Sequence, residues 1–246
     1  MELPTTIPAL PFRMRNVEIL TVVYRTVPGA SDRFVPAPLR TLGERVLLHF
    51  YAIHDAGPYG SYNELAVHIP VEHPASGTRG GFSPMIFLGS DAAIATGREI
   101  YGQPKKLGEI TLEMAGDLVV ARANRNGIDF ATATTPARQR VSTPAALGQV
   151  MFGTNLNLKV SPSVDGTGDT VRELTARDFA EVEIQEVWEG FGTVELRPNA
   201  QAPVHLLPVV EVERAFHWRA DFTATHGRVL ERLIVPAGAD QALVGG

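Results

Sequence analysis

Apolar and polar positions alternate along much of the chain, or apolar residues form short runs bounded by glycine and proline. Both patterns are typical of β-strands. The alternation is clearest in residues 62–69, which place three aliphatic side chains on one face and Glu64, Ala66 and His68 on the other. The imperfect alternation in residues 181–189 predicts a bulge. The predicted strands are 17–25, 46–53, 62–69, 85–88, 109–114, 117–123, 128–134, 181–189, 192–197 and 209–220.

Turns and helices are fewer. Asn126-Gly127 lies between two predicted strands and indicates a tight hairpin. Residues 91–100 predict a helix for which Ser90 or Asp91 can serve as N-cap. Residues 28–35 and 227–234 predict two further short helices, and the Gly/Pro-rich segment 74–81 predicts a loop. Many strands with few helices predict an α+β fold that is mostly antiparallel β, arranged as a barrel or as packed sheets.

The domain organisation is simple. Residues 1–15 begin with three prolines in the first eleven positions and predict an irregular arm, lying on the surface or on a neighbouring subunit. Residues 16–246 predict one domain, because the sequence contains no internal repeat, low-complexity tract or linker long enough to separate two. A chain of 246 residues is long enough to bury a substantial core.

Composition excludes several classes of function. The net charge of −5 argues against a nucleic-acid-binding surface, which needs clustered lysine and arginine. The chain has no cysteine, so disulfides, thiolate metal sites and cysteine nucleophiles are excluded. No apolar run approaches the ~18 residues of a membrane span, and no signal segment opens the chain. We therefore expect a cytoplasmic protein that binds neither membranes nor nucleic acids.

Two adjacent lysines carry the candidate chemistry. Lys105 and Lys106 follow Pro104, at the point where the predicted helix 91–100 gives way to a strand. Such pairs are most often solvated surface charge. In an extended chain, however, consecutive side chains point to opposite faces, so that Lys105 can face inward while Lys106 faces outward. A lysine kept neutral by burial is an amine nucleophile and forms Schiff bases with ketones. Leu107 and the alternating Ile110, Leu112 and Met114 predict that the following strand is half-buried.

Motifs around these lysines resemble those of a known family. The segment 92–99 followed by Pro104-Lys105-Lys106-Leu107-Gly108 closely resembles the signature of the acetoacetate decarboxylase family. Weaker matches occur in the family's order at Asn16, 22–26, 35–39, His54-Asp55, Tyr62-Asn63-Glu64, Asn155, 158–160 and Asp165-Gly166. The resemblance implies one domain built on an antiparallel β-barrel with a pocket inside. It assigns the Schiff base to Lys105, its basic neighbour to Lys106 and a pocket glutamate to Glu64.

The resemblance also has implications for cofactor and assembly. A covalent imine on lysine needs no cofactor, and the relatives commonly self-associate, so a homo-oligomer is expected. Without the resemblance, Glu64 is more often a strand residue that faces water than a catalytic acid or base. Arg98 and Glu99 also match the family, and we expect them to form a salt bridge that fixes the motif.

The sequence departs from the family at three pocket positions. Val17 stands where the decarboxylases carry arginine, His49 where they carry glutamate, and Gln103 where they carry tyrosine. These losses favour aldol condensation and dehydration, with pyruvate as donor and an aldehyde as acceptor, as in divergent members that the sequence resembles. Acetoacetate decarboxylation is the first alternative, and a non-catalytic ligand-binding barrel is the second.

Other candidate sites are weaker. His49, His54, His68 and His73 fall in one region, but their spacing alone is poor support for a metal site, and none is expected. Asp55 is expected to stabilise a turn. The chain has no Gly-x-Ser-x-Gly elbow, phosphate loop or dinucleotide fingerprint. A small-molecule keto acid bound at Lys105 is thus the substrate that the sequence predicts.

Overall fold

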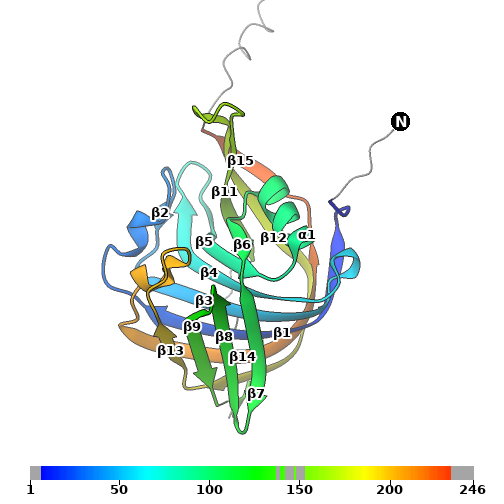
Figure 1. Ribbon diagram of the computed structural model, residues 1–246, viewed down its shortest axis with the longest axis vertical. Helices are drawn as coiled ribbons and strands as arrows, with labels where there is room; N and C mark the ends of the chain where they lie inside the picture. Colours follow the sequence, from blue (N-terminus) through cyan, green and yellow to red (C-terminus); the bar gives the residue numbers. More distant parts are fainter. Residues whose placement is uncertain (1–6, 137–138, 142–146, 148–152, 234–246) are drawn as a thin grey trace, which may run out of the picture.

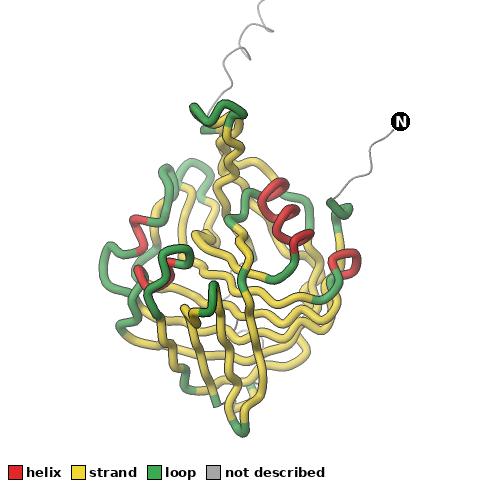
Figure 2. Tube along the Cα trace, in the orientation of Figure 1, coloured by secondary structure: helices red, strands yellow, loops and turns green. Residues whose placement is uncertain are grey.

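The computed structural model describes residues 7–136, 139–141, 147 and 153–233. Strands dominate this part of the chain, and the helices are short (Figures 1 and 2). The large sheet contains β1 (Phe12–Arg25), β2 (Arg40–Thr41), β3 (Arg45–Asp55), β4 (Tyr62–His73), β5 (Thr78–Leu88), β6 (Lys105–Leu107), β10 (Gln139–Arg140), β11 (Thr154–Pro162), β12 (Asp169–Gly190), β14 (Glu211–Ala224) and β15 (Arg228–Arg232). The smaller sheet contains β7 (Glu109–Ala115), β8 (Leu118–Arg125), β9 (Ile128–Thr135) and β13 (Thr193–Leu196).

The order of strands in the large sheet returns on itself. Its path is β2-β4-β3-β1-β14-β12-β11-β5-β6, and β4 also pairs with β5. The pairs β5–β11 and β5–β6 are parallel, whereas the other pairs are antiparallel. The prediction of a mostly antiparallel α+β fold is confirmed. The hairpin at Asn126-Gly127 is also confirmed, with positive φ at both residues, as a tight two-residue turn requires.

The large sheet separates two apolar clusters. One face packs against the four-stranded sheet, which lies in front of its lower half in Figure 1. The other face, called the inner face below, holds a second cluster, which includes Ala66. The strand β4 shows the division predicted from its alternation, because Leu65, Val67 and Ile69 belong to the first cluster. The strands thus give the inner face of the sheet its own apolar environment, in which a polar site can be buried.

A short helical segment connects β5 to β6. The helix α1 (Asp91–Thr96) begins at Ser90, whose side chain accepts a hydrogen bond from the Ala93 amide, as the sequence predicted. A π-helical turn, η3 (Gly97–Tyr101), continues it and ends at Gly102, where φ is 78°. A side chain at Gly102 would overlap the Lys159 backbone, so the chain can only turn here with glycine. This turn delivers the chain to β6.

Two bulges face the same part of β14. The strand β1 has one extra residue relative to β14 between Met14 and Val17, and β12 has one between Ala180 and Glu183. The bulge in β12 confirms the prediction for this segment. Asn16 and Glu181 both have positive φ there. Phe179 and Ile184 are five positions apart, yet both pack in the inner cluster, which the extra residue makes possible. The bulges therefore decide which side chains of β1 and β12 face inward.

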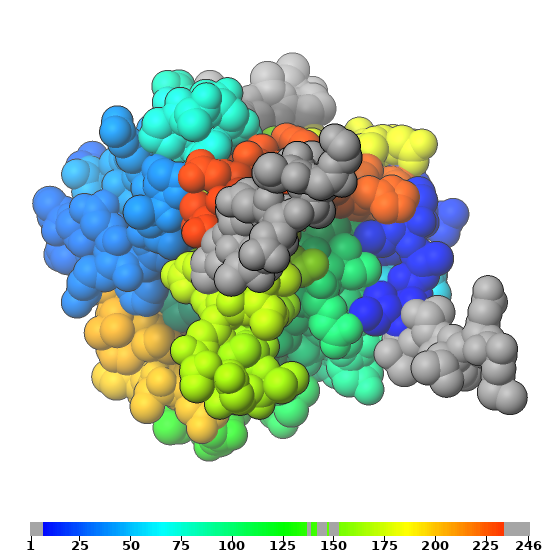
Figure 3. Space-filling view, turned by 90° about the horizontal axis from the view of Figure 1, so that it is seen from above, coloured from blue at the N-terminus to red at the C-terminus, as the bar shows by residue number. Residues whose placement is uncertain are grey.

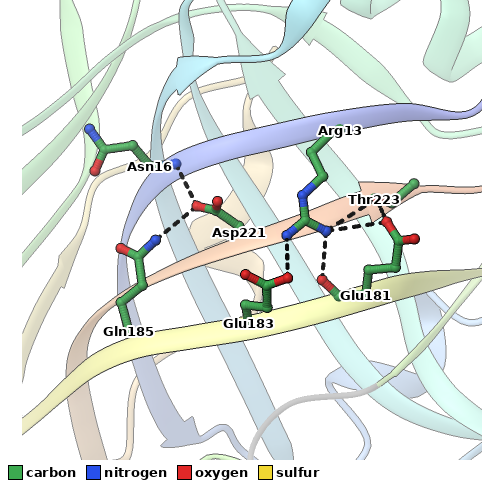
Figure 4. A network of polar contacts seen from close by, with 7 residues as sticks. All are labelled: Arg13, Asn16, Glu181, Glu183, Gln185, Asp221 and Thr223. Atoms are coloured by element: carbon green, nitrogen blue, oxygen red, sulfur yellow. Dashed lines mark hydrogen bonds and ion pairs between the residues drawn. The ribbon is translucent and has the colours of Figure 1, made fainter.

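Polar contacts outside the inner face hold these bulges together (Figure 4). Arg13 donates to the carbonyl of Glu181 at 2.8 Å and pairs with Glu183 at 2.9 Å. Asp221, on β14 between them, accepts hydrogen bonds from the Asn16 amide and from the Gln185 side chain. The network joins β1, β14 and β12 across the two irregular positions.

Several predicted elements were wrong or too short. Residues 228–232 form β15 rather than a helix, because they pair with β12, and their surface is the red patch at the centre of Figure 3; residue 234 lies outside the described residues. Of segment 28–35 only η1 (Ser31–Arg33) is helical, as a 3₁₀ turn, and β5 begins inside the predicted loop 74–81. The remaining 3₁₀ turns are η2 (Gly57–Tyr59) and η4 (Pro203–Leu206).

The ends of the predicted segments also differ. The strand β1 begins at Phe12, inside the range 1–15 assigned to the arm, of which residues 1–6 lie outside the described part. Leu107 and Met114 are exposed rather than half-buried, whereas Ile110 is buried as expected. None of the helices in the described segments has the length and apolar composition that a membrane crossing requires.

Candidate active site

A buried ion pair joins β4 and β6 on the inner face of the large sheet. Lys105, the first residue of β6, donates from Nζ to Oε2 of Glu64 on β4 at 2.9 Å. The two side chains are only 8% and 12% exposed. The strand β5 lies between them, pairing Ile86 with Lys105 and Leu88 with Glu64. An amine and a carboxylate within hydrogen-bond distance can exchange a proton, and an unprotonated amine can attack a carbonyl carbon.

The connection before β6 directs Lys105 inward. Its side chain lies against Gly97 of the π-helical turn, where a Cβ would approach Lys105 Cδ to 2.4 Å. Lys106 is exposed, as the alternation of strand faces predicted. Arg98 donates to the Lys105 carbonyl at 3.4 Å instead of pairing with Glu99 as we expected, because its side chain lies on the outside of the turn. Gly97 and the strand alternation thus place one lysine of the pair inside.

A cavity opens beside this ion pair. Its volume is about 50 Å³, which is room for roughly four water-sized groups. Its described lining is mostly aromatic and aliphatic and comes from β1, β3, β4, β5, β6, β11, β12, β14, η2 and the helical segment with the residues that follow it. The polar and charged side chains of that lining, tyrosines and threonine apart, are Glu64, His68, Gln103, Lys105, Asn155 and Arg177.

Burial keeps His68 and two tyrosines of the lining uncharged. Burial, with a smaller contribution from the nearby Arg177 charge, lowers the pKa of His68 to about 4. Burial also raises the pKa values of Tyr51 and Tyr62, with a smaller contribution from the charge on Glu64. At neutral pH these three side chains can donate or accept hydrogen bonds but carry no charge. The charged groups among the described lining residues are therefore Lys105, Arg177 and Glu64.

Arg177 is a site residue that sequence reasoning missed. It lies on β12, is 7% exposed and lines the cavity. Its guanidinium lies over the rings of Tyr101 and Phe179, at 5.0 and 4.2 Å from their centroids. The sequence predicted a strand only from residue 181, whereas β12 begins at Asp169. Arg177 is two positions before Phe179 and shares its strand face, which is the signal that could have identified it. The bulge at Glu181 interrupts this alternation before the strand predicted at 181–189 begins.

Three predicted pocket residues lie elsewhere. Lys106 is exposed, and neither Val17 nor His49 is among the described lining residues. Val17 is on the inner side of β1, but the bulge at Asn16 brings Met14 to the cavity instead. His49 is buried behind His68, with ring centroids 4.9 Å apart, and its Nδ1 is 2.9 Å from Thr21 Oγ1. The placement of Val17 and His49 in the pocket is therefore wrong, and Lys106 points outward as the strand alternation predicted, whereas Gln103 does line the cavity.

The histidines do not gather around a common point. His73 pairs with Glu231 at 2.8 Å, and His54 is exposed at the surface. Asp55 accepts a hydrogen bond from the Gly57 amide and so stabilises the turn, as expected. Across the described residues, no group of three or more histidine, aspartate or glutamate side chains is arranged to hold a metal ion.

Comparisons with known proteins agree with the fold. The sequence profile of a family described as acetoacetate decarboxylase (ADC) matches residues 1–233. Acetoacetate decarboxylase 1 of Mesorhizobium japonicum is 35% identical over 230 residues, which cover 94% of this chain and 92% of the relative. The crystal structure of acetoacetate decarboxylase from Legionella pneumophila superposes with a TM-score of 0.89 at 30% identity, covering 96% of this chain and 94% of that one.

A more distant structure shares the fold alone. The enduracididine biosynthesis enzyme MppR, solved with the condensation product of pyruvate and imidazole 4-carboxaldehyde, superposes with a TM-score of 0.76 at 18% identity. The match covers 92% of this chain and 91% of that one.

Proposed function

The chain belongs to the acetoacetate decarboxylase family of lyases, and from that premise we propose that it decarboxylates a small β-keto acid through a Schiff base on Lys105. The observation that carries the proposal is the buried contact of 2.9 Å between Lys105 Nζ and Glu64 Oε2 in the lining of the cavity. The amine is the nucleophile, and the carboxylate is within reach of the protons that the amine must lose and regain.

The reaction follows from these two groups. The Lys105 amine attacks the ketone carbon, and loss of water gives a protonated imine. The bond to the carboxylate carbon then breaks, its electron pair moves to the imine nitrogen, and carbon dioxide leaves with formation of an enamine. The enamine takes a proton at the carbon that lost carbon dioxide, and water hydrolyses the imine to release the ketone and the amine. Glu64 serves the proton transfers, and the sequence of steps requires no metal or organic cofactor.

Charge suits the anionic keto acid of either reaction, and size supports decarboxylation over condensation. The described lining carries two cations, Lys105 and Arg177, and one carboxylate, Glu64, so an anionic substrate would neutralise it. A cavity of about 50 Å³ leaves little room for an aldehyde beside a bound keto acid. The loss of charge at Val17, which led us to doubt decarboxylation, is offset by Arg177 on another strand.

Aldol condensation and dehydration with pyruvate and an aldehyde is the second candidate. It is favoured by the uncharged Gln103 and His68 beside the ion pair, which can hydrogen-bond an aldehyde oxygen without adding charge. The solved complex of MppR gives this chemistry a precedent within the fold.

The test compares the two reactions at one enzyme concentration. Carbon dioxide release is measured with acetoacetate, and product formation is measured with pyruvate plus an aldehyde. We expect fast decarboxylation and little condensation. Condensation without decarboxylation would favour the second candidate, and neither activity, with no adduct at Lys105 after borohydride reduction, would favour a ligand-binding protein without turnover.

A further inference from the structure

Arg177 is a buried cation without an anionic partner. Its side chain is 7% exposed, and its Nε is buried with no hydrogen-bond partner within the described residues. It makes no ion pair with any carboxylate that the structure describes. The adjacent Asp178 pairs instead with Arg228. Burial of an unpaired guanidinium is unfavourable, so a site that keeps one needs an anion for at least part of its working cycle.

The surroundings of Arg177 position the guanidinium without neutralising it. Tyr101 lies against it from the helical segment and Phe179 from its own strand, so aromatic faces rather than carboxylates surround the charge. Arg177 and Phe179 are two positions apart on β12 and both line the cavity. The same cation lowers the pKa of His68, which shows that its charge acts across the cavity lining. The guanidinium is thus fixed in orientation and available to a bound ligand.

We propose that Arg177 binds the substrate carboxylate, with the ketone carbon placed at Lys105 Nζ. This inference rests on the proposed function and names the part of the cavity that selects acids over neutral ketones. A guanidinium can form two parallel hydrogen bonds with a carboxylate, which fixes direction as well as affinity. The ligand class is therefore a small β-keto acid with one carboxylate and an otherwise apolar body, which matches the aromatic lining.

The first experiment compares Arg177→Gln and Arg177→Lys with the wild-type chain on two probes. Acetoacetate carries the carboxylate, whereas 2,4-pentanedione is a neutral diketone that forms a conjugated enamine with a lysine amine and is followed by its absorbance. For Arg177→Gln we expect kcat/KM on acetoacetate to fall roughly 10- to 100-fold, the range for loss of a hydrogen bond between charged groups. The fall should appear mainly in KM, because the carboxylate loses its charge as carbon dioxide departs.

The neutral probe and a matched variant supply the controls. Enamine formation with 2,4-pentanedione should stay within about threefold of the wild-type rate in both variants, and Arg177→Lys should recover part of the acetoacetate KM. Arg172→Gln removes an arginine from the same strand, at a partly buried pair with Asp169 away from the cavity, and it should behave as wild type. An equal fall on both probes, or no fall on acetoacetate, would overturn the proposal.

A second measurement needs no variant. Calorimetry on the wild-type chain compares butyrate with butyramide, which have the same shape but differ in charge. We expect butyrate to bind at least ~10-fold more tightly; equal affinity would overturn the assignment even if both variants fail to fold. If the wild-type chain forms no enamine with 2,4-pentanedione and releases no carbon dioxide, the proposed function fails, while the butyrate comparison still decides the role of Arg177.

Discussion

Replacement of Gly97 by alanine should disable the site while leaving the fold intact. A Cβ at this position would lie 2.4 Å from Cδ and 2.8 Å from Cε of Lys105, and 3.0 Å from Oε1 of Gln103. Carbon atoms in good contact lie about 3.5–4.0 Å apart, so the lysine side chain must shift by about 1 Å. Because Lys105 is buried and held at Glu64, that shift moves its Nζ. A misplacement of about 1 Å can lower a rate by ~10²-fold, and we expect imine formation to slow by about that factor.

The backbone at Gly97 allows this prediction to be tested cleanly. Its φ of −59° and ψ of −44° are helical, and alanine is favoured over glycine in a helix by ~1 kcal/mol, so the turn itself tolerates the change. The assay is borohydride trapping of a ketone, quantified by mass spectrometry, with thermal unfolding recorded alongside. Gly89→Ala is the control, since its Cβ would meet nothing closer than 3.9 Å. Trapping at the wild-type rate by folded Gly97→Ala would show that the lysine position is not set by this contact.

Three further predictions concern individual side chains. Lys105→Ala should abolish borohydride trapping, whereas Lys106→Ala, at an exposed side chain, should leave most of it; equal loss in two folded variants would refute the assignment. Glu64→Gln should keep the fold but slow turnover by ~10²-fold, and unchanged kcat would return Glu64 to a structural role. The folded pKa of His68 is about 4, below its ordinary 6.5, so the unfolded chain binds the extra proton first. The lowered pKa corresponds to a contribution of about 3 kcal/mol to the free energy of unfolding, which is fully present above pH 6.5 and is lost as the pH falls toward 4. Denaturant unfolding of His68→Gln at several pH values should show a free energy of unfolding that falls less steeply with decreasing pH than that of the wild-type chain. An unchanged pH dependence would contradict the assignment.

Alternation along strands predicted much of the candidate site. It placed Lys105 inside and Lys106 outside, and it put Glu64 and His68 on one face of β4. These inferences depend only on neighbouring positions in one strand, where the two-residue period holds without interruption. The cap at Ser90 succeeded for the same reason, because a side chain and an amide three residues later are enough to define it.

Longer-range features were beyond the same reasoning. The family resemblance assigned Val17 and His49 to pocket positions, but the distance of each residue along its strand from the cavity depends on how the sheet closes. The bulge at Glu181 reverses the phase of β12, so that Arg177 could not be assigned to a face from the strand predicted at 181–189. The last described strand was predicted as a helix because its pairing partner, β12, lies far away in the sequence.

The central claim is that Lys105 forms an imine with a β-keto acid and that carbon dioxide leaves from that imine. The most direct measurement is borohydride reduction during turnover of fresh acetoacetate, followed by peptide mass spectrometry of the modified lysine. The account predicts an isopropyl group on Lys105, because the carboxylate has been lost before reduction. An adduct that retains the carboxylate would contradict decarboxylation at this site, and an unmodified Lys105 in a chain that releases carbon dioxide would contradict the imine itself.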